Sequence, residues 1–262
     1  MKRLATFILS ITIVFSSFTF TFADDYTKFQ ATTASEIRTE LKQEYKINTC
    51  DVDDYTITWI YETIIDMYKV QPELTEYGLQ HLNKIYTNHS TQYSKTYALT
   101  YYLDGNIQMF GYWFSDEGKN IKDSYVVNTV RTHYHPYSTN FKGVFIHEFM
   151  HIIDGAMQKA HKWEGYSPAN VVTDAMQDYI NDGHSILNAH NWCCKISNYA
   201  AVDDMETLAE AWLDTVQNPN CENEAWYVVN SFWEAYCEYE LEEEAPQANI
   251  YNLTQMAATV ID

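Results

Sequence analysis

The chain has 262 residues, and its 36 acidic against 16 basic side chains give a formal net charge of −20 at pH 7. Nucleic acids and anionic lipids repel so acidic a surface, so neither is expected as a partner. The length suits one domain, and the sequence contains no internal repeat and no Pro/Gly-rich linker that would divide it.

The N-terminus has the pattern of a secretory signal peptide, at residues 1–23. Two basic residues follow the initiator methionine, a long apolar run comes next, and Ala23 ends a small-x-small cleavage site. The alternative is an uncleaved membrane anchor, but the Ser and Thr content of the run and the Ala23 site favour cleavage. We therefore expect residues 24–262 to be a single secreted domain, a monomer with no membrane association after signal cleavage.

The first half of this domain is expected to change from helices to strands. Apolar residues at helical spacing predict three helices, the last with Pro72 in its first turn: 33–47, 54–69 and 72–87. Between Lys95 and Arg131, β-branched and aromatic residues alternate as in strands. Asp104-Gly105 predicts a tight hairpin turn there, and residues 124–130 are predicted as a further strand.

The second half is expected to be helical, at 138–154, 168–181, 203–217 and 223–241. The first of these helices is expected to begin after the candidate N-caps Ser138, Thr139 and Asn140, and to end at Gly155. Together these elements predict an α+β fold with a small mixed or antiparallel sheet and a mainly helical C-terminal part.

Residues 147–151 read His-Glu-Phe-Met-His, which is the most informative pattern in the chain. Two histidines four residues apart lie on one face of a helix, one turn apart, and can bind one zinc ion together. Glu148 beside them can act as the general base toward a zinc-bound water. The alternative is a chance match on a helix whose histidines face solvent.

Two glutamates on the predicted helix 203–217 can complete such a site. Glu206 and Glu210 are four residues apart and therefore face the same way. One of them can be the third protein ligand of a His₂Glu zinc set. The other can accept the free ring N–H of a zinc-bound histidine. The alternative is a pair of solvated glutamates on an acidic chain.

At this point the sequence resembles a known family. His-Glu-Phe-Met-His-Ile-Ile-Asp at 147–154, followed by Tyr199 and Glu-Thr-Leu-Ala-Glu at 206–210, is similar to the catalytic domain of anthrax lethal factor and to secreted bacterial Pro-Pro endopeptidases. These proteins share a zincin fold. The resemblance implies zinc ligation by His147, His151 and Glu206, base chemistry by Glu148, transition-state hydrogen bonding by Tyr199, and support of the ligands by Glu210 and Asp154.

Two features depart from that pattern. Met150 stands where the family often has a small residue, and residues 181–194 look like an insertion between the histidines and Glu206. Neither feature removes a ligand. In zincins an edge strand above the active-site helix takes the substrate in extended form, and one of the predicted strands is expected to do so here.

The expected function is therefore that of a secreted zinc-dependent endopeptidase, with Zn²⁺ as cofactor and a peptide or protein as substrate. Two alternatives remain open. One is a secreted toxin or effector protease aimed at a single host protein. The other is a non-catalytic zincin-fold binding protein, against which the intact Glu148 and Tyr199 argue, since a binding protein needs no base.

The remaining cysteines and histidines are assigned structural roles. Four of the five cysteines lie within 193–237, and because export permits disulfides, bridges are expected there to hold Glu206 in place. None has the CxxC spacing of metal ligands. His133 and His135 are expected in a rim loop, since no carboxylate or cysteine partner lies nearby in the sequence. Expected at the surface or in loops are His161, His184 and His190.

Overall fold

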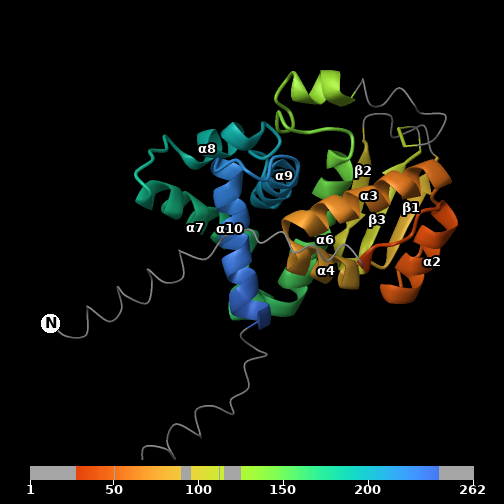
Figure 1. The fold of residues 1–262 in the computed structure, drawn as a ribbon. Coiled ribbons are helices and arrows are strands. Elements are labelled where there is room, and N and C mark those ends of the chain that lie inside the picture. Colours follow the sequence, from red (N-terminus) through yellow and green to blue (C-terminus); the bar gives the residue numbers. More distant parts are fainter. Residues whose placement is uncertain (1–27, 50, 90–95, 112, 115–124, 242–262) are drawn as a thin grey trace, which may run out of the picture.

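The computed structural model describes residues 28–49, 51–89, 96–111, 113–114 and 125–241. The predicted signal peptide and Cys50 lie outside these residues. Helix α6 (Gly143–His161) stands in the middle of the fold, with the sheet and helices α2–α4 on one side and helices α7–α10 on the other (Figure 1). Within the described residues, no helix has the length and apolarity needed to cross a bilayer.

The sheet has three strands in the order β1-β3-β2, so it is small and mixed as predicted. Strand β1 (Lys84–Asn88) runs parallel to β3 (Asn106–Phe110), and β2 (Ala98–Tyr101) runs antiparallel to it. The predicted hairpin is present between β2 and β3, where the 3-10 turn η3 (Tyr102–Asp104) ends at Gly105 with a left-handed φ of 65°. Strand β2 forms one edge of this sheet.

Three helices lie on the sheet side of α6: α2 (Ala34–Glu44), α3 (Asp54–Val70) and α4 (Pro72–His81). Thr33 and Glu36 form a capping box at the start of α2, and the Asp53 side chain caps α3. The prediction of one helix over 72–87 is wrong, because α4 ends at His81 and the next residues enter strand β1. Residues 84–88, which include Ile85 and β-branched and aromatic neighbours, form backbone hydrogen bonds with β3, and this pairing favours a strand over a helix.

The predicted strand at 124–130 is also wrong. Its described residues Val126–Val130 form a single π-helical turn, η5, and the Thr129 hydroxyl donates to the carbonyl of Tyr125. The β-branched residues that suggested a strand, at 126, 127, 129 and 130, pair with none of the strands of the described sheet. Without a neighbouring strand, the residues satisfy their backbone groups within the turn.

Helix α6 begins later and ends later than predicted. Residues 138–140 form turns before it, and its N-cap Lys142 makes no side-chain capping bond. Gly155 does not end the helix, which continues to His161. A Cβ at Gly155 would lie 2.6 Å from the Cβ of Tyr102, so glycine is used here for close packing against η3.

The other side of α6 is covered by helices whose bounds are α7 (Pro168–Asn181), α8 (Ala189–Ile196), α9 (Asp204–Gln217) and α10 (Glu224–Tyr236), followed by the π-helical turn η7 (Cys237–Leu241). Helix α8 lies within the segment that looks like an insertion. Helix α9 packs directly against α6. The four described cysteines, Cys193, Cys194, Cys221 and Cys237, are free, so none of the expected disulfides forms among them.

Candidate metal centre

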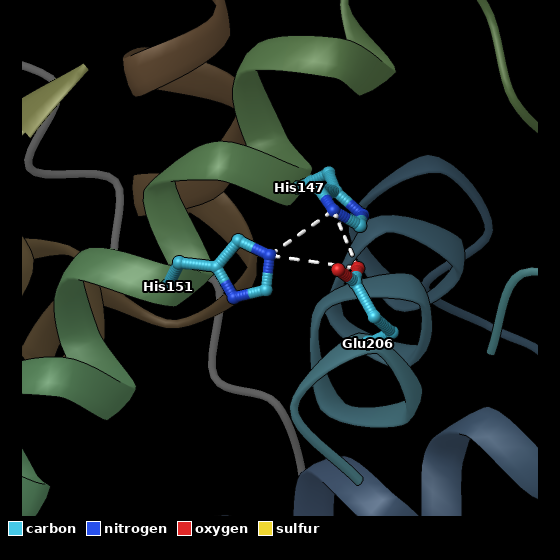
Figure 2. A group of neighbouring side chains, drawn as sticks. All are labelled: His147, His151 and Glu206. Atoms are coloured by element: carbon cyan, nitrogen blue, oxygen red, sulfur yellow. Dashed lines mark hydrogen bonds and ion pairs between the residues drawn. The ribbon is translucent and has the colours of Figure 1, made fainter. Parts of the chain in front are cut away.

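Helices α6 and α9 bring three candidate ligands together. His147 and His151 point from one face of α6 toward Glu206, which comes from the first turn of α9 (Figure 2). The backbone N–H of Glu206 donates to the Asp203 side chain at 2.9 Å, and this N-cap fixes where α9 begins. The helix start therefore sets the position of the carboxylate opposite the two imidazoles.

The ligand atoms converge on one point. The Nε2 atoms of His147 and His151 are 3.2 Å apart, and Glu206 Oε2 lies 3.0 Å from the first and 3.6 Å from the second. Ligands arranged tetrahedrally at bond lengths of about 2.0–2.1 Å are about 3.4 Å from one another, so a triangle of this size can accommodate a metal ion. Glu206 Oε2 is also buried without a hydrogen bond of good geometry.

Glu210 lies one turn beyond Glu206 and holds His147 from behind. Its side chain is completely buried, and it accepts a hydrogen bond from His147 Nδ1 at 2.7 Å. That bond leaves His147 Nε2 facing Glu206. The contact is the one expected for the partner of a metal-binding histidine. Glu210 also accepts from the Ser197 hydroxyl at 2.8 Å.

His135 is a further partner of Glu210, and sequence reasoning did not find it. Its Nδ1 lies 2.8 Å and 3.0 Å from the two Glu210 oxygens, and the residue is buried, not exposed on a rim loop. The carboxylate that was missing from its sequence neighbourhood lies 75 residues further along the chain. No local signal links these positions, because the contact exists only after α9 has packed on α6.

Glu148 is buried beside the cluster and contacts the edge strand. The Thr100 hydroxyl on β2 lies 2.6 Å from Glu148 Oε2 and 3.0 Å from the Glu148 backbone carbonyl. This contact orients one carboxylate oxygen. The other, Oε1, accepts no hydrogen bond from the residues that the structure describes, and Glu148 lines the neighbouring cavity.

Tyr199 lies over the cluster. Its hydroxyl donates to Glu206 Oε1 at 3.1 Å, and its ring stacks on His147 with a centroid separation of 5.6 Å. The ring also stacks against that of Tyr134, with a centroid separation of 5.0 Å. The burial of Tyr199, with the charge of Glu206, raises the pKa of its phenol, so the hydroxyl keeps its proton at neutral pH.

Asp154 is placed differently from the other predicted residues. It accepts from the Tyr166 hydroxyl and from the Gln158 amide, each at 2.6 Å, and no hydrogen bond joins it to His151 within the described part of the chain. Burial raises the pKa of Asp154. The structure therefore shows Asp154 bonded within α6 and to Tyr166 in the loop before α7, one turn away from the cluster.

The charges of the cluster are strongly coupled. Burial alone would lower the pKa of His147, but its contacts with the Glu206 and Glu210 carboxylates outweigh burial and raise it. Burial would likewise raise the pKa of both glutamates. The adjacent His147 and His151 rings lower the pKa of Glu206 instead, and the charges of His135 and His147 lower that of Glu210. Both carboxylates are therefore ionised at neutral pH.

A cavity of about 230 Å³ opens beside the cluster. Its wall combines the candidate base with aromatic rings and the beginning of the edge strand, and it is formed by Thr96, Tyr97, Ala98, Tyr134, His135, Val144, His147, Glu148 and Tyr199.

Comparison with protein-family models, with curated proteins and with solved structures found no match to this chain.

Proposed function

We propose that this protein is a zinc-dependent endopeptidase with a zincin-like fold, in which His147, His151 and Glu206 hold the metal ion. The observation that carries the proposal is the convergence of three ligand atoms, 3.0 to 3.6 Å apart, directly beside the buried Glu148. Two imidazoles and one carboxylate suit zinc, and three protein ligands leave a position open for chemistry.

A bound zinc ion would lower the pKa of a water molecule and polarise a peptide carbonyl. Glu148 would take a proton from the attacking water and transfer it to the leaving amine. Its geometry suits this task, because Thr100 fixes Oε2 while Oε1 is free of hydrogen bonds from the described residues.

Tyr199 would donate a hydrogen bond to the oxygen that becomes negative when the carbonyl is attacked. Its hydroxyl lies at the cluster, 3.1 Å from Glu206 Oε1, and its raised pKa keeps it a donor. The hydroxyl would exchange its partner from Glu206 to the substrate oxygen. This exchange makes its contribution specific to the transition state.

The substrate would lie along the outer edge of β2. Thr96, Tyr97 and Ala98 contribute to the cavity wall, and Thr100 reaches Glu148 from the same segment. An extended peptide paired with this edge would bring a carbonyl close to the base. Together with the signal-like residues 1–23, this arrangement supports an enzyme that acts on peptides outside the cell.

Incubation of the purified mature protein with a peptide library, with and without a chelator, tests the proposal. We expect internal cleavage that the chelator abolishes and added zinc restores, and about one zinc ion per chain by elemental analysis. The Glu148→Gln variant is the matched control, since it should keep the metal and lose the cleavage. Zinc binding without any cleavage would indicate a binding protein instead, and absence of zinc after dialysis against it would refute the metal site.

A further inference from the structure

We infer that His135 is a positioning residue of the metal centre, which fixes the Glu210 carboxylate so that His147 presents Nε2 to the metal. The inference rests on the proposed function, since it assigns a role toward the same metal ion. It adds a histidine from a third part of the chain, which precedes both the active-site helix and α9 by sequence.

Glu210 is held by three donors and is completely buried. Oε1 receives His147 Nδ1 at 2.7 Å and His135 Nδ1 at 2.8 Å, and Oε2 receives the Ser197 hydroxyl at 2.8 Å. Its exposed fraction is 0%. Removal of His135 would take away one of these three fixed donors, and a mobile water entering from the cavity would not hold the carboxylate toward His147 as firmly.

His135 must be the donor in this contact. Glu210 Oε1 also lies 2.7 Å from His147 Nδ1, and Oε2 accepts from the Ser197 hydroxyl, so the carboxylate is the acceptor toward all three groups and the proton of this contact belongs to His135 Nδ1. The same reasoning assigns the proton of the second contact to His147 Nδ1. Both histidines then keep Nε2 on the side away from Glu210. For His147 that side faces the cluster. Because its Nδ1 is bonded to Glu210, Nε2 is the only ring nitrogen left to bind a metal ion.

The backbone around His135 is itself tied to the site. The N–H of Asn198 donates to the carbonyl of His133 at 2.8 Å, and the N–H of Tyr199 donates to that of Tyr134 at 3.1 Å. His133 has a left-handed φ of 53°, and its ring bonds the carbonyl of Cys194 at 3.0 Å. One short segment therefore holds Tyr199 through its backbone and Glu210 through the His135 side chain.

His135 also lines the cavity, so a direct role toward substrate must be separated from positioning. Two substitutions do this. His135→Ala removes both ring nitrogens. His135→Asn keeps an N–H donor close to the position of Nδ1, but offers nothing in place of Nε2. A positioning role predicts that Asn restores what Ala loses, whereas a role through Nε2 predicts that it does not.

The matched control is His161→Asn. His161 is as buried as His135, with exposed fractions of 5% and 6%, and it also contacts carboxylates, Glu164 and Glu240. It lies at the far end of α6, away from the cluster. Asn at this position removes the Nε2 contact with Glu240, so the variant reports the loss of a buried histidine–carboxylate contact without involvement of the metal centre.

The experiment measures zinc affinity by competition with a chromophoric chelator, and the absorption spectrum of the cobalt-substituted protein, for the wild type and the three variants. We expect His135→Ala to lower the zinc affinity by about 10- to 100-fold and to change the cobalt spectrum, as loss of an outer hydrogen-bond partner does. His135→Asn should stay within a few-fold of the wild type, and His161→Asn should be unchanged.

Zinc affinity of His135→Ala within two-fold of the wild type would overturn the inference, and so would an equal loss in His161→Asn. Failure of Asn to restore the affinity would do the same. These readouts do not depend on cleavage: a wild type that binds zinc tightly but hydrolyses no peptide would refute the proposed function and leave the His135 result valid. A wild type that binds no metal would overturn both.

Discussion

Helix α6 carries two clusters of histidine and carboxylate, one in its N-terminal half and one at its C-terminal end. At the first, His147, His151 and Glu206 direct three ligand atoms to one point, 3.0 to 3.6 Å apart. At the second, His161 Nδ1 contacts Glu164 at 2.9 Å and Nε2 contacts Glu240 at 2.8 Å.

The second cluster therefore occupies both ring nitrogens of one histidine, which lie on opposite sides of the imidazole. Its carboxylates cannot share a metal ion through that ring. The cluster connects the end of α6 to η6 (Lys162–Glu164) and to η7, and the Tyr77 hydroxyl joins it at Glu240. The comparison shows that the same residue types form either a ligand set or a structural tie, and that convergence of the atoms distinguishes them.

Substitution of a carboxylate in each cluster should give the largest difference. Glu206→Ala removes a proposed ligand and should abolish zinc retention and hydrolysis together. Glu210→Ala should weaken zinc binding by about 10- to 100-fold, as loss of a histidine's hydrogen-bond partner does. Glu240→Ala should leave zinc content unchanged. Elemental analysis after dialysis checks all three, and stronger zinc loss in Glu210→Ala than in Glu206→Ala would exchange their roles.

Glu148→Gln should lower the rate of hydrolysis by about 10²- to 10⁴-fold, because an amide cannot accept the proton of the attacking water. Zinc content and melting temperature should stay close to those of the wild type. Steady-state kinetics with a cleaved peptide, together with zinc analysis, measure the effect. Turnover near that of the wild type would place the base elsewhere in the cavity.

Two tyrosines allow the same comparison for a phenol. Tyr199→Phe should lower kcat by about 10²- to 10³-fold with little change in KM, zinc content or stability. Tyr166→Phe removes the hydroxyl bonded to Asp154 and should instead cost about 1–3 kcal/mol of stability, with kcat retained. Kinetics and thermal unfolding separate the two. A Tyr199→Phe variant with an unchanged kcat and a lowered melting temperature would show that this hydroxyl contributes to folding alone.

The smallest expected effect concerns the pH dependence of the His161 tie. Burial alone would lower the pKa of His161, but its bonds to Glu164 and Glu240 raise it above the unfolded value of about 6.5. The contribution of these His161 contacts to the free energy of unfolding is therefore complete below about pH 6.5. It declines as the pH rises through the raised pKa of the folded state. His161→Asn should lower the free energy of unfolding more at pH 6 than at pH 9, and the difference should not exceed about 3 kcal/mol. Chemical denaturation measures this difference. An equal loss of stability at both pH values would contradict a charged His161 in contact with Glu164 and Glu240.

The approach of His147 and His151 to one another was predictable because its signal is local, whereas the choice of Glu206 over Glu210 followed from the resemblance. His147, Glu148 and His151 share one helical turn, and Glu206 lies in the first turn of a helix whose cap, Asp203, is a recognisable start. The α+β class and the Asp104-Gly105 turn followed from equally local patterns. The expected disulfides among Cys193, Cys194, Cys221 and Cys237 did not form, because connectivity depends on distances that sequence does not contain.

The errors arose where a contact distant in sequence decides the structure. Strand β1 exists because β3 pairs with it, and His135 belongs to the site because Glu210 arrives from α9. His161, expected at the surface or in a loop, is buried in α6 because η7 folds back and supplies Glu240. In each case the local sequence allowed another structure, and tertiary packing selected this one.

Gly155 allows helix α6 to pack closely against the turn that follows β2. It meets Tyr102 directly after β2 ends, and an added Cβ would come within 2.6 Å of that residue's Cβ. The absence of a side chain at this position therefore fixes how closely the edge strand approaches α6, and with it the 2.6 Å contact between Thr100 and Glu148. A methyl group there would act as a wedge two turns from His147. The spacing between base and substrate would then widen although no residue that touches either had changed.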